Sequence, residues 1–473
     1  MYDFFLERWL SLLTNEIQNL LFGKRLLLDE IPFSIQELDQ LHQNGLIEME
    51  QGIVQCEIKR PWGKQTIHRC CRCGNTDQRL FHSYPCEKCH QECTYCRKCL
   101  NMGVVKSCSK LVTWVGPPPK FLEYTMPICK WTGQLSSRQI EASDGLAKAL
   151  MRRENYLIWA VCGAGKTELL FPAIEKLLQD GRIIAIATPR TDVVRELYPR
   201  LKKAFPQVRM SAHYSGSQDT QDSASLVLTT THQLLRFYRY FDHIIIDEID
   251  AFPFHHDAML HFAVNQACRL KSSKAYLSAT PPADLKTPFL KNQLQGTRIP
   301  VRFHGHPLPV PKCIWIGNWK RRLKKSRLPS LFMKWLMKTS QFNCPIFIFV
   351  PSVTILKHLF HALKEQIDVS IDHVHAEDPN RHDKITRFRQ GATQVLVTTT
   401  ILERGVTVSR SRVAIFGSED AIFDEAALVQ MAGRAGRSLE DPKGEVVFFH
   451  YGKTLEMMKA INHIKSMNRE GGF

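Results

Sequence analysis

Short apolar runs alternate with amphipathic stretches over most of the chain, from about residue 130 onward. Each run is rich in β-branched residues and apolar throughout, which is typical of parallel strands covered by helices on both faces. Five runs come first, at 156–161, 183–188, 226–230, 243–246 and 275–277. Five more follow, at 345–350, 369–374, 394–398, 413–416 and 445–449. The pattern predicts an α/β fold with two successive lobes, each built on a parallel sheet.

The 473 residues are enough for several domains with substantial cores, and the texture of the sequence suggests where they lie. Met1 to Leu28 is interpreted as an amphipathic helix, and Gly116–Pro119 as a stiff spacer. The expected parts are a mainly helical segment at 1–60, a Cys-rich module at 61–115, lobe 1 at 128–300, a Pro-rich basic connector at 301–327 and lobe 2 at 328–473.

The first apolar run leads into a loop suited to binding phosphate. Residues Ala160–Thr167 read A-V-C-G-A-G-K-T, directly behind Tyr156–Trp159. Backbone N–H groups of Gly163, Ala164 and Gly165 can surround a β-phosphate, while Lys166 adds positive charge and the Thr167 hydroxyl can hold Mg²⁺. The loop therefore predicts ATP and Mg²⁺ as ligands, although Ala160 departs from the Gly of the strict Walker pattern.

An acidic pair ends the fourth apolar run. Asp247 and Glu248 close the string H-I-I-I-D-E. ATP hydrolysis needs a carboxylate that holds Mg²⁺ and another that orients water, and we assign these roles to Asp247 and Glu248 respectively. A helix N-cap is the structural alternative for such a pair.

The second lobe carries the string Q-M-A-G-R-A-G-R, from Gln430 to Arg437. Guanidinium groups such as those of Arg434 and Arg437 can reach across a cleft and stabilise charge at a γ-phosphate. The string indicates that ATP lies between the lobes, so that lobe closure and opening become a mechanical stroke.

The formal net charge of +17 favours a polyanionic partner, of which nucleic acid is the first candidate. The densest basic run, W-K-R-R-L-K-K-S-R, extends from Trp319 to Arg327. Trp319 would be available for stacking on a base. A solvated linker explains the same run equally well.

No apolar stretch is long enough to cross a bilayer, and the N-terminal segment lacks the features of a signal peptide. A cytoplasmic protein is expected, with docking at the inner face of the cell membrane as an additional hypothesis.

Nine of the 15 cysteines lie between Cys70 and Cys108, and without an export signal this crowding favours metal over disulfides. Cys70-x-x-Cys73 and Cys96-x-x-Cys99 can supply the four thiolates that Zn²⁺ prefers. Cys86-x-x-Cys89 and Cys93-x-x-Cys96 have the same spacing. A second or binuclear site from Cys86, Cys89 and Cys93, with His82 or His90, therefore stays open, as does an iron–sulfur cluster. Cys71 and Cys108 have no assigned role, and a structural role for the metal is expected.

The span from about 132 to 452 resembles a superfamily 2 helicase core of two RecA-like lobes. The resemblance is carried by the P-loop, the arginine string and the blocks L-S-S-R-Q (135–139), T-P-R-T (188–191), T-T-T (229–231), D-E-I-D (247–250), S-A-T (278–280) and T-T-T-I-L-E-R-G (398–405). It implies that Gln139, Gly405 and Gln430 contact ATP. It also implies that Ser278, Ala279 and Thr280 couple the nucleotide to DNA. Arg190, Thr230 and Thr400 would meet DNA phosphates, so that binding is tolerant of sequence and sensitive to salt.

The sequence further resembles the ComFA family. The telling strings are I-W-A-V-C-G-A-G-K-T-E (158–168), A-T-P-R-T-D-V-V (187–194), T-T-T-H-Q-L-L-R (229–236), S-A-T-P-P (278–282), T-T-T-I-L-E-R-G-V-T-V (398–408) and the upstream cysteines. The family's C-x-R-C-G and Y-C-R-x-C strings imply that Cys70, Cys73, Cys96 and Cys99 are the zinc ligands. The resemblance also implies an ATPase that moves single-stranded DNA during competence, with ComEC and ComFC as partners and homo-oligomers conceivable.

Two other functions fit parts of the sequence. A replication-restart helicase resembling PriA shares this core, but its Cys module is inserted within the core, whereas here it precedes the P-loop. A zinc-dependent DNA or partner adaptor with little ATPase activity is the alternative from another class. The intact Lys166, Asp247, Glu248, Arg434 and Arg437 argue against it. We find no evident strand-separating pin in the sequence, so translocation need not imply unwinding.

Overall fold

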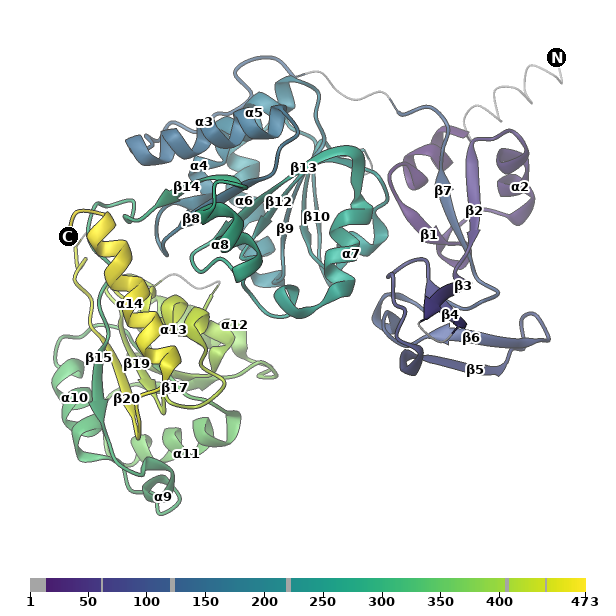
Figure 1. The fold of residues 1–473 in the computed structure, drawn as a ribbon. Coiled ribbons are helices and arrows are strands. Elements are labelled where there is room, and N and C mark those ends of the chain that lie inside the picture. Colours follow the sequence, from purple (N-terminus) through teal and green to yellow (C-terminus); the bar gives the residue numbers. More distant parts are fainter. Residues whose placement is uncertain (1–13, 61–62, 120–123, 218–222, 405–407, 439) are drawn as a thin grey trace.

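The computed structural model describes residues 14–60, 63–119, 124–217, 223–404, 408–438 and 440–473. Two parallel sheets form the two lobes, and an N-terminal region with antiparallel strands lies beside the first of them (Figure 1). Among the described residues, none of the helices combines the length and the hydropathy that crossing a bilayer requires.

The N-terminal segment is mixed in structure instead of mainly helical. Its described residues are helical at 14–21, but the predicted helix does not continue to Leu28, because residues 25–27 form a strand; residues 1–13 lie outside the described part. A three-stranded antiparallel sheet has the order β1-β7-β2. Its strands and the accompanying helix are β1 (Arg25–Leu27), α2 (Ile35–Gln43), β2 (Ile47–Gln51) and β7 (Lys110–Trp114). Local periodicity missed these strands because their partner β7 follows the whole Cys-rich module.

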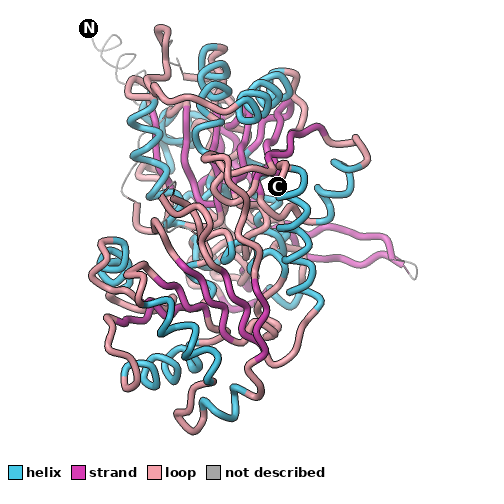
Figure 2. Tube along the Cα trace, turned by 90° about the vertical axis from the view of Figure 1, so that its left-hand side faces the viewer, coloured by secondary structure: helices cyan, strands magenta, loops and turns pink. Residues whose placement is uncertain are grey.

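Two antiparallel hairpins carry most of the strands of the Cys-rich region, which begins at Ile53, before the predicted boundary at residue 61; neither hairpin is joined to a larger sheet. They are β3 (Ile53–Arg60) with β4 (Gly63–Cys70), and β5 (Phe81–Pro85) with β6 (Glu92–Cys96). The β3–β4 hairpin projects from the body of the molecule (Figure 2).

Lobe 1 is a seven-stranded sheet in the order β10-β11-β9-β12-β13-β8-β14, with every pair parallel. The strands are β8 (Tyr156–Ala160), β9 (Ile184–Thr188), β10 (Met210–His213), β11 (Leu226–Thr230), β12 (Phe241–Asp247), β13 (Cys268–Ser278) and β14 (Gln295–Ile299). The helices are α3 (Ser137–Met151), α4 (Lys166–Leu169), α5 (Phe171–Gln179), α6 (Thr191–Ala204), α7 (Ala258–Ala267) and α8 (Ala283–Leu290).

Lobe 2 is a six-stranded parallel sheet in the order β15-β20-β19-β16-β18-β17. The strands are β15 (Lys312–Trp315), β16 (Ile346–Phe349), β17 (Ile371–Val374), β18 (Val395–Thr398), β19 (Arg412–Phe416) and β20 (Val446–His450). The helices are α9 (Trp319–Leu323), α10 (Ser330–Ser340), α11 (Val353–Lys364), α12 (Arg381–Arg389), α13 (Glu425–Ala432) and α14 (Leu455–Glu470).

All ten apolar runs contain strands, and most of their side chains are buried on both faces of the two sheets. The edge strand β17 differs, because only Val374 among its residues is buried. The predicted connector, in contrast, does not remain a linker between the lobes. Its residues supply β15 and α9 to lobe 2. Trp319 is 1% exposed, and its indole N–H donates to the Glu419 carboxylate at 2.7 Å. The expectation that Trp319 stacks on a base is therefore wrong, since the ring packs in the lobe 2 core against Phe416.

Candidate functional site

The loop after β8 has the backbone of a phosphate cradle. Gly163 and Gly165 adopt φ angles of 83° and 70°, a region that side chains other than glycine rarely enter. A Cβ at Gly165 would lie 2.5 Å from the Gln139 amide nitrogen, so this position also lacks room for a side chain. The helix α4 begins at Lys166, which directs its N-terminal N–H groups toward the loop.

Gln139 is tied to this loop. Its side-chain amide donates to the Ala164 carbonyl at 2.9 Å, and its oxygen accepts from the Ser136 backbone N–H at 2.8 Å. The second bond belongs to the N-terminal cap of α3. Gln139 thus holds the loop to a helix, and its predicted contact with adenine stays a prediction.

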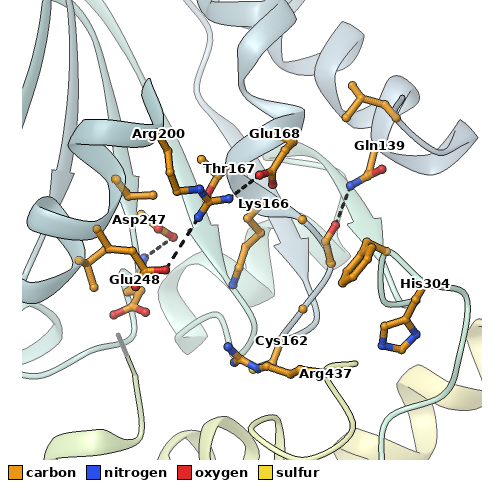
Figure 3. A pocket seen from close by; sticks show the side chains of 18 of the residues that line it. Gln139, Cys162, Lys166, Thr167, Glu168, Arg200, Asp247, Glu248, His304 and Arg437 are labelled. Atoms are coloured by element: carbon orange, nitrogen blue, oxygen red, sulfur yellow. Dashed lines mark hydrogen bonds and ion pairs between the residues drawn. The ribbon is translucent and has the colours of Figure 1, made fainter. Parts of the chain in front are cut away.

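Asp247 ends β12 and Glu248 follows it, and both line the same cavity (Figure 3). Burial raises the pKa of Asp247 to about 6, against the opposing charge of Lys166. Glu248 has a φ of 55°, and one of its carboxylate oxygens is buried without a hydrogen-bond partner. A water molecule could donate a hydrogen bond to that oxygen, which fits the water-orienting role expected of Glu248.

Lobe 2 closes the opposite side of the cavity. Arg434 and Arg437 line it together with Gln430, whereas Gly405 lies outside the described residues. The Arg434 guanidinium donates to the Glu403 carbonyl at 2.9 Å, and that of Arg437 to the Gly433 carbonyl at 2.8 Å. Both arginines are thus held by backbone carbonyls of their own lobe and line the same cavity as Lys166. Arg437 lies on the side of the cavity opposite the phosphate-loop helix (Figure 3).

The cavity has a volume of about 480 Å³, which is suitable for a nucleotide. Five cationic side chains line it beside Asp247 and Glu248: Lys166, Arg200, Arg404, Arg434 and Arg437. This donor set fits a polyanion accompanied by a divalent cation. Sequence reasoning had placed these groups together, and the structure does bring them to one cavity.

Three residues that the sequence did not single out come from the start of the predicted connector, and two of them, Phe303 and His304, line the cavity. Phe303 donates its backbone N–H to the Gly163 carbonyl at 3.0 Å, and its side chain is 56% exposed. Arg302 and His304 both donate to the Gly436 carbonyl in lobe 2, His304 at 3.1 Å. Burial, reinforced by the charge of Arg437, lowers the pKa of Arg302 to about 9. The segment therefore joins the phosphate loop to the arginine string, and only its basic composition was visible in the sequence.

The predicted coupling block meets the acidic box through Asp250. The Ser278 and Thr280 hydroxyls donate to the Asp250 carboxylate at 2.6 and 2.8 Å, and Ala279 accepts from the Trp159 indole at 3.1 Å through its carbonyl. Burial would raise the pKa of Asp250, but the charge and hydrogen bond of Arg404 outweigh it and hold the pKa well below its usual range.

Arg404 is a second residue that sequence reasoning missed, although it stands inside the T-T-T-I-L-E-R-G string. It comes from lobe 2, is buried, and forms an ion pair with Asp250 of lobe 1. Its other guanidinium nitrogen lies 3.8 Å from the Glu248 carboxylate and has no hydrogen-bond partner. The sequence shows an acidic string at 247–250 and an arginine in the string 398–405, which could have suggested an ion pair between the lobes. It does not show which of the charged residues form that pair.

In the Cys-rich module, Cys70, Cys73, Cys96 and Cys99 have sulfur atoms within 4.8 Å of one another. The Cys70–Cys99 distance is 3.9 Å and the Cys73–Cys96 distance 3.7 Å. All four side chains are at most 2% exposed. A tetrahedral ion with Zn–S bonds of about 2.3 Å separates its sulfurs by about 3.8 Å, so these thiols fit Zn²⁺.

Comparison with known proteins identifies the chain's relatives. Residues 11–113 match the Competence protein ComFA N-terminal domain. Residues 132–283 match the Type III restriction enzyme, res subunit, and residues 324–438 the Helicase conserved C-terminal domain. The chain is 44% identical to Competence protein ComFA of Bacillus subtilis over 97% of its own length and 96% of that protein. The chain belongs to the ComFA family.

The Streptococcus pneumoniae ComFA is 36% identical over 80% of this chain and 86% of its own. Among solved structures, the DEAD-box helicase Mss116 bound to ssRNA and UDP-BeF covers 72% of this chain and 83% of its own, with a TM-score of 0.52 at 16% identity. That likeness shows the fold alone, two RecA-like lobes. This ComFA-family chain is thus a competence helicase-like motor whose domains imply ATP hydrolysis. Membership of the ComFA family favours the competence motor over the PriA-like replication-restart helicase.

The predicted DNA contacts of this ComFA-family chain lie near the lobe boundary. Arg190 caps α6 and donates to the Ile401 carbonyl of lobe 2. Burial lowers its pKa, against the charges of Glu248 and Glu403. Thr230 ends β11 and is 5% exposed, and Thr400 lines a second cavity with Asp250 and Thr280. In this arrangement Arg190 holds the lobes together, and its contact with DNA stays a prediction.

Proposed function

We propose that this chain is an ATP-driven translocase on single-stranded DNA, which draws transforming DNA into the cell during competence. The observation that supports it best is the composition of one cavity. Lys166, Asp247 and Glu248 come from lobe 1, whereas Arg434 and Arg437 come from lobe 2. ATP bound in such a cavity contacts both lobes, so its hydrolysis changes the contacts between them. A motor requires such a change in the relative position of its lobes.

The residues divide the chemistry among them. Lys166 and the N–H groups around Gly165 bind the β- and γ-phosphates, while Thr167 and Asp247 hold the cation. A Mg²⁺ ion held by Thr167 and Asp247 would neutralise phosphate charge during the attack on the γ-phosphate. Glu248 orients the attacking water through its carboxylate, one oxygen of which accepts no hydrogen bond from the protein. Arg434 and Arg437 stabilise the charge that develops at the γ-phosphate.

Asp250 transmits the state of this cavity. It accepts hydrogen bonds from Ser278 and Thr280 in lobe 1 and pairs with Arg404 in lobe 2. When product release frees the lobe 2 arginines, the lobes separate and Arg404 leaves Asp250. The two lobes then step apart along a strand held by Arg190, Thr230 and Thr400, whose contacts are to phosphates and so independent of sequence.

The Cys70, Cys73, Cys96 and Cys99 set holds a structural Zn²⁺ in this proposal. Its four side chains pack in one apolar cluster with lobe 1 residues, among them Leu234 and Leu260. Family membership supports ComEC and ComFC as partners and the inner face of the cell membrane as the place of action.

The deciding experiment measures ATP hydrolysis with and without single-stranded DNA. The wild type should be stimulated by DNA, and stimulation should fall steeply with rising salt. Lys166→Ala should lose about 10²-fold or more in kcat/KM. Lys176→Ala, a change of the same charge on the exposed face of α5, should behave as wild type. Hydrolysis without any response to DNA would overturn the proposal, and an absence of hydrolysis in the wild type would favour the adaptor alternative.

Movement itself needs a separate assay. Streptavidin bound at one end of a biotinylated single strand should be displaced by the wild type in the presence of ATP. Glu248→Gln should leave the streptavidin in place while still binding DNA. ATP-dependent displacement by the Glu248→Gln variant would contradict the assigned role of the carboxylate.

A further inference from the structure

A second group of four cysteines lies in the Cys-rich module, apart from the set already described. Cys86, Cys89, Cys93 and Cys108 have sulfur atoms that all lie within 4.8 Å of one another. Cys86 and Cys89 belong to the turn between β5 and β6, Cys93 lies on β6, and Cys108 precedes β7. The sequence analysis assigned no role to Cys108. Among the described residues, the fourth member of this group is Cys108, and neither His82 nor His90 belongs to it.

The sulfur atoms are spaced for a shared ion. Cys86 and Cys108 are 3.9 Å apart, and Cys89 and Cys93 are 3.2 Å apart. A disulfide would require about 2.05 Å, and these cysteines are free. The separations instead approach the roughly 3.8 Å between thiolates around a tetrahedral Zn²⁺.

The turn that carries Cys86 and Cys89 repeats the backbone of the turn that carries Cys70 and Cys73. In the earlier turn, Gly74 N–H donates to the Cys70 carbonyl at 2.9 Å, and Cys70 N–H to the Asn75 carbonyl at 3.0 Å.

In the later turn, His90 N–H donates to the Cys86 carbonyl at 2.8 Å, and Cys86 N–H to the Gln91 carbonyl at 2.9 Å. Gly74 and His90 occupy the same place and both have positive φ, 71° and 55°. A non-glycine residue in this region is uncommon, and His90 adopts it at the position where the earlier turn has a glycine. Two turns of identical hydrogen bonding, each presenting two thiols on one side, indicate the same purpose.

The hairpin formed by β5 and β6 also needs an anchor. A two-stranded hairpin in water is marginally stable, and this one joins no larger sheet. Cys96 ties one end of it to the first set of thiols, whereas Cys86, Cys89 and Cys93 lie toward the turn at the other end. Cys93 and Cys96 are three residues apart on β6 and so face opposite sides of the strand.

Cys108 connects the hairpin to the segment that leads into β7. The Ser107 N–H donates to the Thr94 carbonyl at 2.8 Å, which brings that segment beside β6. An ion held by Cys86, Cys89, Cys93 and Cys108 would therefore fasten the hairpin to the central strand of the N-terminal sheet.

We propose that Cys86, Cys89, Cys93 and Cys108 bind a second Zn²⁺, so that one chain carries two separate tetrathiolate ions. Each thiol gives up its proton on binding, and the four thiolates are the donors that a tetrahedral d¹⁰ ion prefers. The proposal is independent of ATP hydrolysis and would stand if the motor function failed.

The test counts metal on the purified full-length chain by inductively coupled plasma mass spectrometry. The wild type should carry two zinc ions per chain. Cys89→Ser and Cys108→Ser should each retain one zinc ion, the one held by the Cys70 set. Cys73→Ser should also retain one, the ion held by the Cys86 set. Cys56→Ser, a half-buried thiol on β3 outside both groups, should retain two.

A second measurement needs no variant. Substitution of cobalt(II) into the wild type should give the visible absorption of two tetrahedral thiolate sites per chain. A single zinc or cobalt per chain, iron in place of zinc, or a disulfide between any two of Cys86, Cys89, Cys93 and Cys108 would overturn the proposal.

Discussion

Arg404 and Asp250 form a buried ion pair that connects lobe 2 to lobe 1, with side-chain exposures of 2% and 3%. Asp250 also accepts hydrogen bonds from the Ser278 and Thr280 hydroxyls, so one carboxylate of the acidic box contacts both the coupling block and the opposite lobe. Removing two charges from water is costly, and the pair can persist only while the lobes stay closed around it. The pair is therefore suited to report lobe closure to the nucleotide cavity.

Breaking this pair should impair the motor. Arg404→Ala should lower DNA-stimulated kcat by about 10²-fold, because Asp250 loses its only described partner of opposite charge. Asp250→Asn should have a similar effect, and the double variant should be no worse than either, since the two residues act as one unit. Steady-state kinetics on the three variants tests this.

The matched control is another arginine between the lobes. Arg298 pairs with Glu470 at 2.8 Å, but this pair is partly exposed. Exposed pairs contribute little, so Arg298→Ala should keep kcat within about twofold. Equal losses in Arg298→Ala and Arg404→Ala would show that the burial of the pair is not what matters.

Glu248 and Lys166 should separate catalysis from binding. Glu248→Gln should lower kcat by about 10²-fold or more with little change in the Kd for ATP, because the neutral amide no longer orients and polarises water. Lys166→Ala should instead weaken nucleotide binding itself. Binding of a fluorescent ATP analogue, compared with turnover, distinguishes the two, and a large Kd change in Glu248→Gln would argue against its role.

Phe303 is expected to stack on the adenine. It lines the cavity, is 56% exposed and is anchored to the phosphate loop through Gly163. Stacking of a base on an aromatic ring contributes about 1–3 kcal/mol, so Phe303→Ala should raise the KM for ATP about tenfold with kcat nearly unchanged. Phe342→Ala, an exposed ring outside this cavity, is the control. An unchanged KM in Phe303→Ala would remove Phe303 from the site.

The stability of lobe 1 should fall in mild acid because of His243. This residue on β12 is 1% exposed, and burial lowers its pKa to about 4. Below pH 6.5 the His243 imidazole binds a proton in the unfolded chain but stays neutral in the folded protein. The free energy of unfolding therefore decreases as pH falls from about 6.5 toward 4. By pH 5 this effect should reach about 2 kcal/mol.

Urea-induced unfolding at pH 7 and pH 5 measures this loss. His243→Asn has no imidazole to protonate and should lose about 2 kcal/mol less than the wild type between the two values. His358→Asn, at an exposed position of α11, should keep the wild-type pH response. An identical response in His243→Asn would assign the pH dependence to other groups.

Much of the fold could be predicted from the sequence because most strands of the two lobes are short, continuous apolar runs. Strands such as Ile184–Thr188 and Leu226–Thr230 are apolar on both faces, and the predicted two-lobed α/β class is confirmed. Short or polar strands escaped, among them Met210–His213, Gln295–Ile299 and Lys312–Trp315. These strands are recognised by their neighbours in the sheet and not by their own composition.

The sequence by itself determined which chemical groups this protein has and in what order: a phosphate loop, an acidic box, an arginine string and clustered thiols. Each of these is a short stretch of chain whose spacing alone reveals its chemistry. Only the tertiary structure decided which groups meet. Arg404 pairs with Asp250, and Arg302 donates a hydrogen bond to the Gly436 carbonyl, because the two lobes pack against each other. Cys108 lies beside Cys86 because the chain folds back between segments that are distant in sequence. Such contacts depend on the burial of whole surfaces, and no local pattern carries that information.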